Sequence, residues 1–477
     1  MKKVGDVYNV TDVASLAGTS FSAYAKRVQI LEISERMDLK AEIKVDSSVY
    51  LHVSEVLGGA PLLPSLHSIR LLTTTTTFPP GLAIRLLLPC PALQAVQIAG
   101  SALDSPWFYQ IGLPLLASRA RSIKHLALSH DTAKIPPLLW STMLSFPELD
   151  KLDIRLPQSN SVPGQFLTQL GTRANRLLDL NLHVPLDRLA NVEFNQAGYR
   201  TLRRVNEVSI ANADESLYPN LDSLSVLYSS ELRLLQCVSG ASAARHITSL
   251  TLHISPISIS NLPQTAHTLA ACRHLKRVTL KETQPETSIG TDGVLRFMGA
   301  LKLEDFVIDV SRLKVDDYSQ NCLSTADGSL ENILRGREGL RSLVLPCKWL
   351  DTSASLNSLV SIPRVAPSMR CVGLAIDSSL TSHADELPKL ISSTSLLRSS
   401  QSSELVELEI CDVRAPSNPF SPFEYQAIAQ FIDTCFPKLT SIRLHPTSTF
   451  RDFWTCVEQL RIVYKEMRLL SSRLTRN

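Results

Sequence analysis

One hydrophobic pattern recurs along most of this chain: apolar-x-x-apolar-x-apolar. It occurs as Leu149-Leu152-Ile154 in FPELDKLDI, as Leu221-Leu224-Val226 in YPNLDSLSV and as Leu439-Ile442-Leu444 in FPKLTSIRL. The last two apolar positions are two residues apart, so their side chains leave the same face of a β-strand. We therefore expect one strand for each hexad, with its apolar positions buried and its intervening residues in solvent.

The hexad can be placed about fifteen times. Its first apolar positions are Val28, Leu66, Leu93, Ile123, Leu149, Leu177, Val205, Leu221, Ile247, Leu275, Leu303, Leu340, Met369, Leu405 and Leu439. Most are about 26 to 30 residues apart, within or just above the range of leucine-rich repeats. The steps into Leu66, Leu340, Leu405 and Leu439 are longer and indicate insertions. The step from Val205 to Leu221 is short, so one of these two hexads is expected to be false.

Six repeats carry a proline two residues before the hexad. These are Pro64, Pro91, Pro147, Pro219, Pro367 and Pro437. Proline cannot continue a preceding helix, so it indicates a helix-to-strand junction. Helical patterns do precede several hexads, at Phe166 to Leu170, Thr265 to Cys272, Val294 to Met298, Leu330 to Leu334, and Tyr425 to Cys435.

This order predicts an α/β fold. We expect a leucine-rich-repeat solenoid, a horseshoe of the ribonuclease-inhibitor type, with parallel strands and with helices on the convex side. The expected domains are an N-terminal extension (1–20), the solenoid (21–446) and a C-terminal capping helix (447–477). A doubly wound α/β domain is the alternative, although such a sheet has no reason to repeat one proline junction six times.

The expected capping helix has apolar residues at helical spacing, namely Phe453, Val457, Leu460 and Tyr464. Basic residues are expected on its other faces: Arg451, Arg461, Lys465 and Arg468. A serine-rich stretch from Ser378 to Glu404 falls within a long step between repeats and indicates a surface insertion.

Composition restricts the class of partner. Net charge is only +3, from 48 basic and 45 acidic residues, which does not point to nucleic acid or an acidic membrane. The nine cysteines form no C-x-x-C pair, and several lie in apolar segments, such as Cys371, Cys411 and Cys456. We expect reduced, buried thiols in a cytoplasmic or nuclear protein. Neither a signal peptide nor a membrane-spanning helix is evident in the sequence.

The sequence contains no recognisable catalytic or cofactor motif: no Walker motif, G-x-G-x-x-G, G-x-S-x-G or H-E-x-x-H occurs. His125 and His130, like His246 and His253, lack cysteine or carboxylate partners at zinc spacing. The sequence therefore predicts no cofactor, no metal site and no enzyme.

The solvent face of the expected sheet is the candidate binding surface. The residues that directly follow the hexads are Arg155, His183, Ala211, Leu227, His253, Lys281 and Asp309. Of these, Arg155, His183, His253 and Lys281 form the candidate partner-binding set, suited to an extended or acidic segment. The residues two positions earlier, from Asp153 to Thr279, are small and polar. Near the C-terminus, Glu407, Glu409 and Asp412 form an expected acidic edge.

The segments FSAYAKRVQILEISER, PLLPSLHSIRLL, LPCPALQAVQIAG, FPELDKLDIRL and YPNLDSLSV resemble the fungal F-box/leucine-rich-repeat proteins. The resemblance covers about Phe21 to Leu444, the repeat region only. It implies a substrate receptor of a cullin-type ubiquitin ligase, in which an F-box binds the Skp-type adaptor and the repeats hold the substrate. The residues before Phe21 contain no Leu-Pro helical motif of that kind.

The predicted function is therefore a non-enzymatic, protein-binding leucine-rich-repeat scaffold with an unidentified protein partner. One alternative is a substrate receptor of a cullin-type ubiquitin ligase with a missing or degenerate F-box, which would bind the ligase adaptor if an F-box exists upstream. The other is an enzyme on a parallel α/β sheet, which would need a deep pocket at the carboxyl ends of the strands with a perturbed acid or histidine.

Overall fold

The computed structural model of the protein divides into two compact units, Met1–Ile247 (unit 1) and Thr248–Asn477 (unit 2). The structure describes residues 2–4, 7–9, 23–34, 44–45, 55, 57–58, 60–73, 90–104, 106, 108–131, 137–156, 166–184, 220–228, 246–255, 259, 262–270, 272–314, 326–346, 348, 354–381, 403–415, 420, 422–448 and 450–474.

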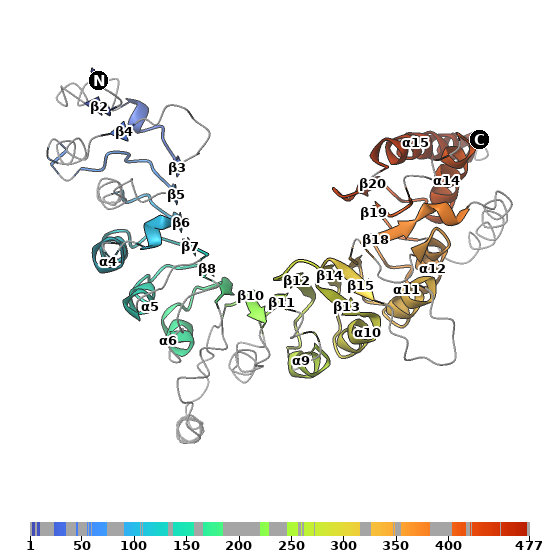
Figure 1. Ribbon diagram of the computed structural model, residues 1–477, viewed down its shortest axis with the longest axis horizontal. Helices are drawn as coiled ribbons and strands as arrows, with labels where there is room; N and C mark the ends of the chain where they lie inside the picture. The colour runs from blue at the N-terminus through green and yellow to red at the C-terminus, as the bar shows by residue number, and fades with distance from the viewer. Residues whose placement is uncertain are drawn as a thin grey trace. The chain divides into compact units, whose positions relative to one another are not determined.

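Unit 1 is built on a parallel sheet whose strands follow one another in chain order. They are β3 (Ile30–Ser34), β5 (Ser68–Thr73), β6 (Ala95–Gly100), β7 (His125–Ser129), β8 (Lys151–Arg155), β9 (Asp179–His183) and β10 (Ser223–Tyr228). The helical segments are η2 (Ser101–Asp104), η3 (Phe108–Gly112), α4 (Leu113–Arg119), α5 (Pro137–Met143) and α6 (Phe166–Arg173). The three α-helices lie on one side of the sheet (Figure 1). A small separate sheet contains β1 (Lys2–Val4), β2 (Val7–Asn9) and β4 (Lys44–Val45).

Unit 2 repeats this plan. Its parallel strands are β11 (Ser249–Ile254), β12 (Arg277–Glu282), β14 (Asp305–Asp309), β16 (Ser342–Val344), β18 (Cys371–Asp377), β19 (Glu407–Asp412) and β20 (Ser441–Leu444). Its helices are α9 (Leu262–Leu269), α10 (Thr291–Gly299), α11 (Ala326–Leu334), α12 (Ser358–Val365), η7 (Ser378–Thr381), α14 (Pro422–Cys435) and α15 (Arg451–Leu474). Short strands β13 (Ser288–Gly290) and β15 (Arg312–Lys314) pair with each other, and β17 (Ala354–Ser355) pairs with β18.

The α/β class with parallel strands is thus confirmed. Every predicted hexad within the described residues starts two positions before a strand. Leu221 precedes β10, whereas Val205 lies outside the described residues. The predicted helices are also confirmed, except that α9 ends at Leu269, before Cys272. Helices α4, α5 and α12 were not predicted, and proline occurs within or at the start of each of them.

The strands begin in the same way from repeat to repeat. A four-residue turn ends at the first hexad position; for example, the Leu177 N–H donates to the Ala174 carbonyl at 3.0 Å. The next two N–H groups share one carbonyl of the preceding repeat, that of the residue directly before its strand: Lys124 and His125 both donate to Gln94 O, at 2.8 and 2.9 Å. The recurring proline occupies the second residue of this turn, where its fixed φ is favourable. Its repetition therefore follows from one repeated turn.

The core consists of the alternate apolar positions and the helices above them. Leu250 and Leu252 are 1% and 0% exposed, which confirms the predicted strand register. Phe297 of α10 stacks on Phe306 of β14, with ring centroids 5.8 Å apart. In β20, Ile442 and Leu444 are only partly buried. The prediction of full burial was wrong for these two because β20 has a strand neighbour only on the β19 side.

The C-terminal helix α15 packs on α14 and β20, and its Phe453 and Val457 are buried as predicted. The prediction for Arg461 was wrong, since this residue is 1% exposed. Its guanidinium donates to the Leu439 and Thr440 carbonyls and forms an ion pair with Glu458. Three hydrogen-bond acceptors compensate for the loss of water around the buried charge.

Candidate binding surface

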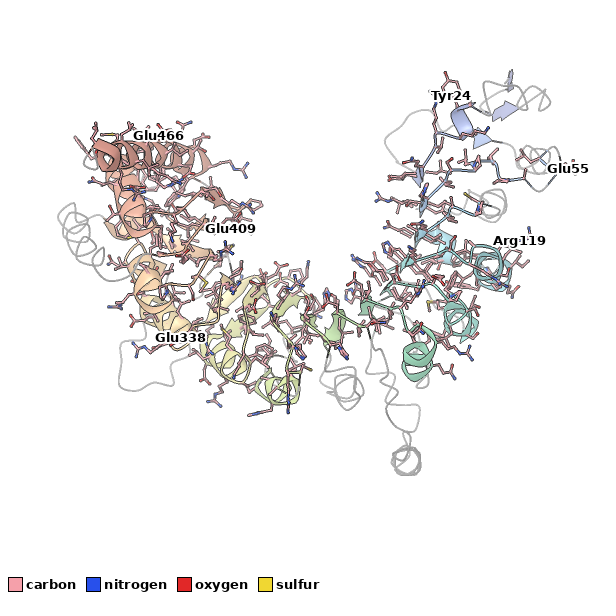
Figure 2. The ribbon with its side chains drawn as sticks, turned by 180° about the vertical axis from the view of Figure 1, so that it is seen from behind. Tyr24, Glu55, Arg119, Glu338, Glu409 and Glu466 are labelled. Carbon is pink, nitrogen blue, oxygen red and sulfur yellow. The ribbon has the colours of Figure 1, made fainter. Side chains whose placement is uncertain are left out.

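The side of each sheet that faces away from the helices is here called the open face. It carries the residues between the buried apolar positions. Glu409 of β19 lies on this side in unit 2 (Figure 2). Because parallel strands pair residue for residue, equivalent positions form straight rows across the strands, about 4.7–4.9 Å apart.

In unit 1 the structure places the predicted residues Arg155 and His183 side by side in one row. Arg155 is not an isolated cation, however, because its guanidinium forms a two-pronged ion pair with Asp153 at 3.0 Å. Asn181 also donates to that carboxylate, at 2.9 Å. The net positive charge of this row is therefore smaller than the sequence suggested.

Two histidines of this face, His125 and His183, hold lowered pKa values. Burial is the main cause for both. The next cause is a neighbouring cation, Lys151 for His125 and Arg155 for His183, and nearby carboxylates such as Asp153 oppose the shift. His183 is therefore neutral at pH 7, and the basic character of the row comes mainly from arginine.

These shifts predict a pH dependence of stability. The pKa of each histidine in the folded protein lies below the ordinary value of 6.5, so the unfolded chain takes up protons first as pH falls. The two neutral histidines therefore contribute their full stabilisation of the folded protein above about pH 6.5, and this contribution is lost as the pH falls below that value. The His125→Gln/His183→Gln variant should lose less melting temperature than the unaltered chain between about pH 7.5 and about pH 5.5.

Carboxylates should contribute little in that pH range. Hydrogen bonds from Lys276 and Arg335 lower the pKa values of Glu304 and Glu331, respectively, from the ordinary value of 4.5. Both carboxyl groups are therefore already ionised in this pH range. Differential scanning calorimetry at several pH values is the measurement. Identical pH slopes for the variant and the unaltered chain would contradict the assignment.

In unit 2 the predicted residues His253 and Lys281 also lie side by side, with Asp309 next in the row. Lys281 Nζ is 3.5 Å from an Asp309 carboxylate oxygen, so this charge is paired as well. The four predicted residues thus form two pairs of neighbours, one in each unit. Ala211, predicted to lie between them, is outside the described residues.

The middle row of the same open face has a different character. It runs Thr251, Thr279, Val307, Val344, Gly373, Glu409, Arg443 from β11 to β20. Val307 and Val344 are partly exposed and are direct neighbours. We call Val307, Val344, Gly373 and Cys371 the valine patch.

Gly373 leaves the space that the Val344 side chain occupies in the valine patch. A β-carbon at this position would approach Val344 Cγ1 to 3.0 Å and Glu409 Cβ to 3.5 Å. The side chain of Val344 therefore leans over the glycine. Beside it in the preceding row, burial raises the pKa of the Cys371 thiol, which stays uncharged at neutral pH. The valine patch is therefore an uncharged centre, and the charged residues Glu407, Glu409 and Arg443 lie along one border of it. Arg443 and Glu407 form an ion pair at 2.9 Å.

The predicted acidic edge is wrong for Asp412, which is 3% exposed. Its carboxylate accepts hydrogen bonds from Ser378 Oγ at 2.7 Å, Trp454 Nε1 at 2.9 Å and the Arg414 N–H at 3.1 Å. The reason is tertiary, because α15 covers the end of β19. Ser378 is also fully buried, so the predicted surface insertion cannot begin at that residue.

The cysteines are partly as predicted. Cys411 is buried and Cys371 is partly buried, whereas Cys456 is exposed on α15, which corrects the prediction for that residue. Across the described part of the chain, no cluster of three or more potential metal ligands occurs. No described helix is both long and apolar enough to cross a membrane.

A cavity of about 10 Å³ lies inside unit 1, room for about one water molecule. Its lining is apolar and includes Ile69, Val96, Phe108 and Leu116. It lies between the sheet and the helices and has no polar surface. It has none of the polar groups that would hold a substrate in place.

Sequence reasoning missed the valine patch although the signal was present. The predicted row of small polar residues on the open face ends at Thr279. The same hexad position in the next repeats is Val307, Val344 and Gly373. The long step into Leu340 separates these residues in sequence, and only strand pairing shows that they are neighbours.

Comparison with known proteins adds little. No family model matches the sequence, and no curated protein matches it. Among solved structures, a Bacteroides fragilis protein from the Northeast Structural Genomics Consortium is similar over 52% of this chain and 76% of its own. The TM-score is 0.29 and the identity is 12%. A likeness this slight carries no conclusion about fold or function.

Proposed function

We propose that the chain is a non-enzymatic, protein-binding leucine-rich-repeat solenoid of the ribonuclease-inhibitor type, similar to the repeat region of F-box/leucine-rich-repeat proteins. The repeated turn, the shared carbonyl and the chain-order parallel strands within each unit support the repeat architecture. The resemblance of the repeat sequences supports the family, and the open face of unit 2 supports the binding role.

The observation that carries the proposal is the valine patch. An ordinary solvated strand face displays polar side chains, as Thr251 and Thr279 do in the same row. Val307 and Val344 depart from that pattern at two neighbouring strands. An apolar centre with a charged border is the usual anatomy of a protein–protein interface.

The border indicates the chemistry of the partner. Glu409 follows Gly373 in the middle row, and Glu407 follows Cys371 in the row beside it. We infer a protein segment that places small apolar side chains on Val307 and Val344 and a basic side chain near Glu409. Within unit 2, the row of His253 with Lys281 would add polar contacts that affect association rate and salt dependence. The row of Arg155 with His183 would do the same for a partner segment on unit 1.

Val344→Asp should weaken partner binding at least about tenfold, because a carboxylate would lose its water in the apolar centre. The melting temperature should change by no more than about 4 °C, since the side chain is partly exposed. Affinity capture followed by mass spectrometry would identify proteins bound by the unaltered chain and lost by the variant. Calorimetric titration with the purified partner would then measure the affinity.

The matched control is Thr251→Asp, which places the same charge in the same row, three strands away. It should retain the captured protein. If Val344→Asp captures the same proteins with unchanged affinity, the valine patch is not the binding site. The ubiquitin-ligase and enzyme alternatives stay predictions.

A further inference from the structure

The outer surface of α15 suggests a second interaction site, independent of the open face. Figure 1 shows this helix at the end of unit 2, beyond α14 and β20. Its inner side is firmly held: Trp454 and Val457 are 1% and 0% exposed. Lys465 donates to the Leu439 carbonyl at 2.9 Å, and Arg468 donates to the Asp433 carbonyl at 3.0 Å. The orientation of the helix about its own axis is thereby set.

A row of apolar residues remains on the outside. It consists of Cys456, Leu460, Val463, Met467, Leu470 and Leu474. Val463 is 50% exposed, Met467 57%, Leu470 56% and Leu474 78%, while Cys456 is exposed and Leu460 is partly buried. We call this row the apolar stripe. Large side chains at such exposure are unfavourable in water, so the stripe is a candidate interface.

The spacing within the stripe identifies the kind of partner. Successive members are four, three, four, three and four residues apart. This is the heptad spacing, which averages 3.5 residues and keeps a seam directed at a second helix over several turns. A strand or an irregular loop would not require it. The occupant is therefore an α-helix with an apolar seam of its own.

The helix that meets this requirement is α15 of a second copy. A two-fold interface uses one patch twice, so the stripe would be its own partner. With side chains about half exposed, each stripe offers on the order of 500 Å², and two copies would bury about 1,000 Å², which is about the minimum area of a biological interface.

The edges of the stripe also permit self-association. By their spacing, Gln459, Glu466 and Arg473 lie along one edge, and Tyr464 and Ser471 along the other. Of these five residues, Glu466 (Figure 2) and Arg473 are charged, and their charges have opposite signs. Two identical helices therefore meet little like-charge repulsion. We propose that the chain forms a two-fold homodimer through the apolar stripes of two α15 helices.

The test measures the mass of the full chain in solution by sedimentation equilibrium, at about 1 to 50 μM. The unaltered chain should show twice its 52.6 kDa. Met467→Glu/Leu470→Glu should raise the dissociation constant at least about 100-fold, because both carboxylates would be buried in the seam. The melting temperature of the monomer should be retained, since both side chains lie away from the core.

The matched control is Ile462→Glu/Leu469→Glu. These residues are 42% and 49% exposed on the same helix but lie outside the stripe. This variant should remain a dimer. A monomeric unaltered chain, a dimeric stripe variant, or equal dissociation of both variants would each overturn the proposal. So would a monomer that floats with anionic vesicles only when the stripe is intact, because the stripe would then be a membrane contact.

Discussion

Replacing Leu280 with alanine is expected to lower the free energy of unfolding by about 2–5 kcal/mol. The side chain is 0% exposed and pairs in register with Leu252 of β11 and Ile308 of β14. Both neighbours are themselves buried, so the strands cannot close over the missing methyl groups without moving the backbone. The loss contains the transfer free energy of the removed atoms and the cost of the remaining cavity.

The control for this change is Thr279→Ala, one residue earlier in the same strand. Thr279 is partly exposed on the open face, so its replacement should change stability by about 0.5 kcal/mol or less. Guanidinium unfolding of the full chain, followed by far-ultraviolet circular dichroism, would compare the two midpoints. Similar losses at both positions would contradict the strand register.

Asp412→Asn is the second change with a large expected effect, a loss on the order of 3 kcal/mol. One oxygen of the buried carboxylate accepts from Ser378 Oγ and Trp454 Nε1, and the other accepts from the backbone N–H groups of Ser378 and Arg414. Asparagine has nearly the same shape, but its amide group donates hydrogen bonds. At least one pair of donors would then face each other, away from water.

The matched control is Asp309→Asn, the same change on the open face. Asp309 is 61% exposed and forms a surface ion pair with Lys281. Such pairs contribute about 0–1 kcal/mol, so this variant should melt close to the unaltered chain. Scanning calorimetry would measure both melting temperatures. If Asp412→Asn is as stable as Asp309→Asn, the hydrogen-bonded cluster does not hold α15 against β19.

The apolar hexad was sufficient to predict the strands because it reflects a local requirement. Two positions two residues apart must face a core, and a proline suits the turn before them. Among the helices found from spacing, α10 has a clear apolar face, since Val294, Phe297 and Met298 are buried. Helix α12 escaped prediction because Pro363 lies inside it, at a position where proline usually interrupts a helix.

By itself, then, the sequence determined the α/β class, the strand register and most of the buried strand positions, because each follows from the alternation of side chains along a strand. Tertiary structure alone decided the chemistry of the surfaces. Asp412 is buried because α15 lies over it, and Lys281 is paired because Asp309 lies beside it on the next strand. Val344 meets Gly373 only through strand pairing. Burial and charge pairing depend on residues distant in sequence, and no local pattern records them.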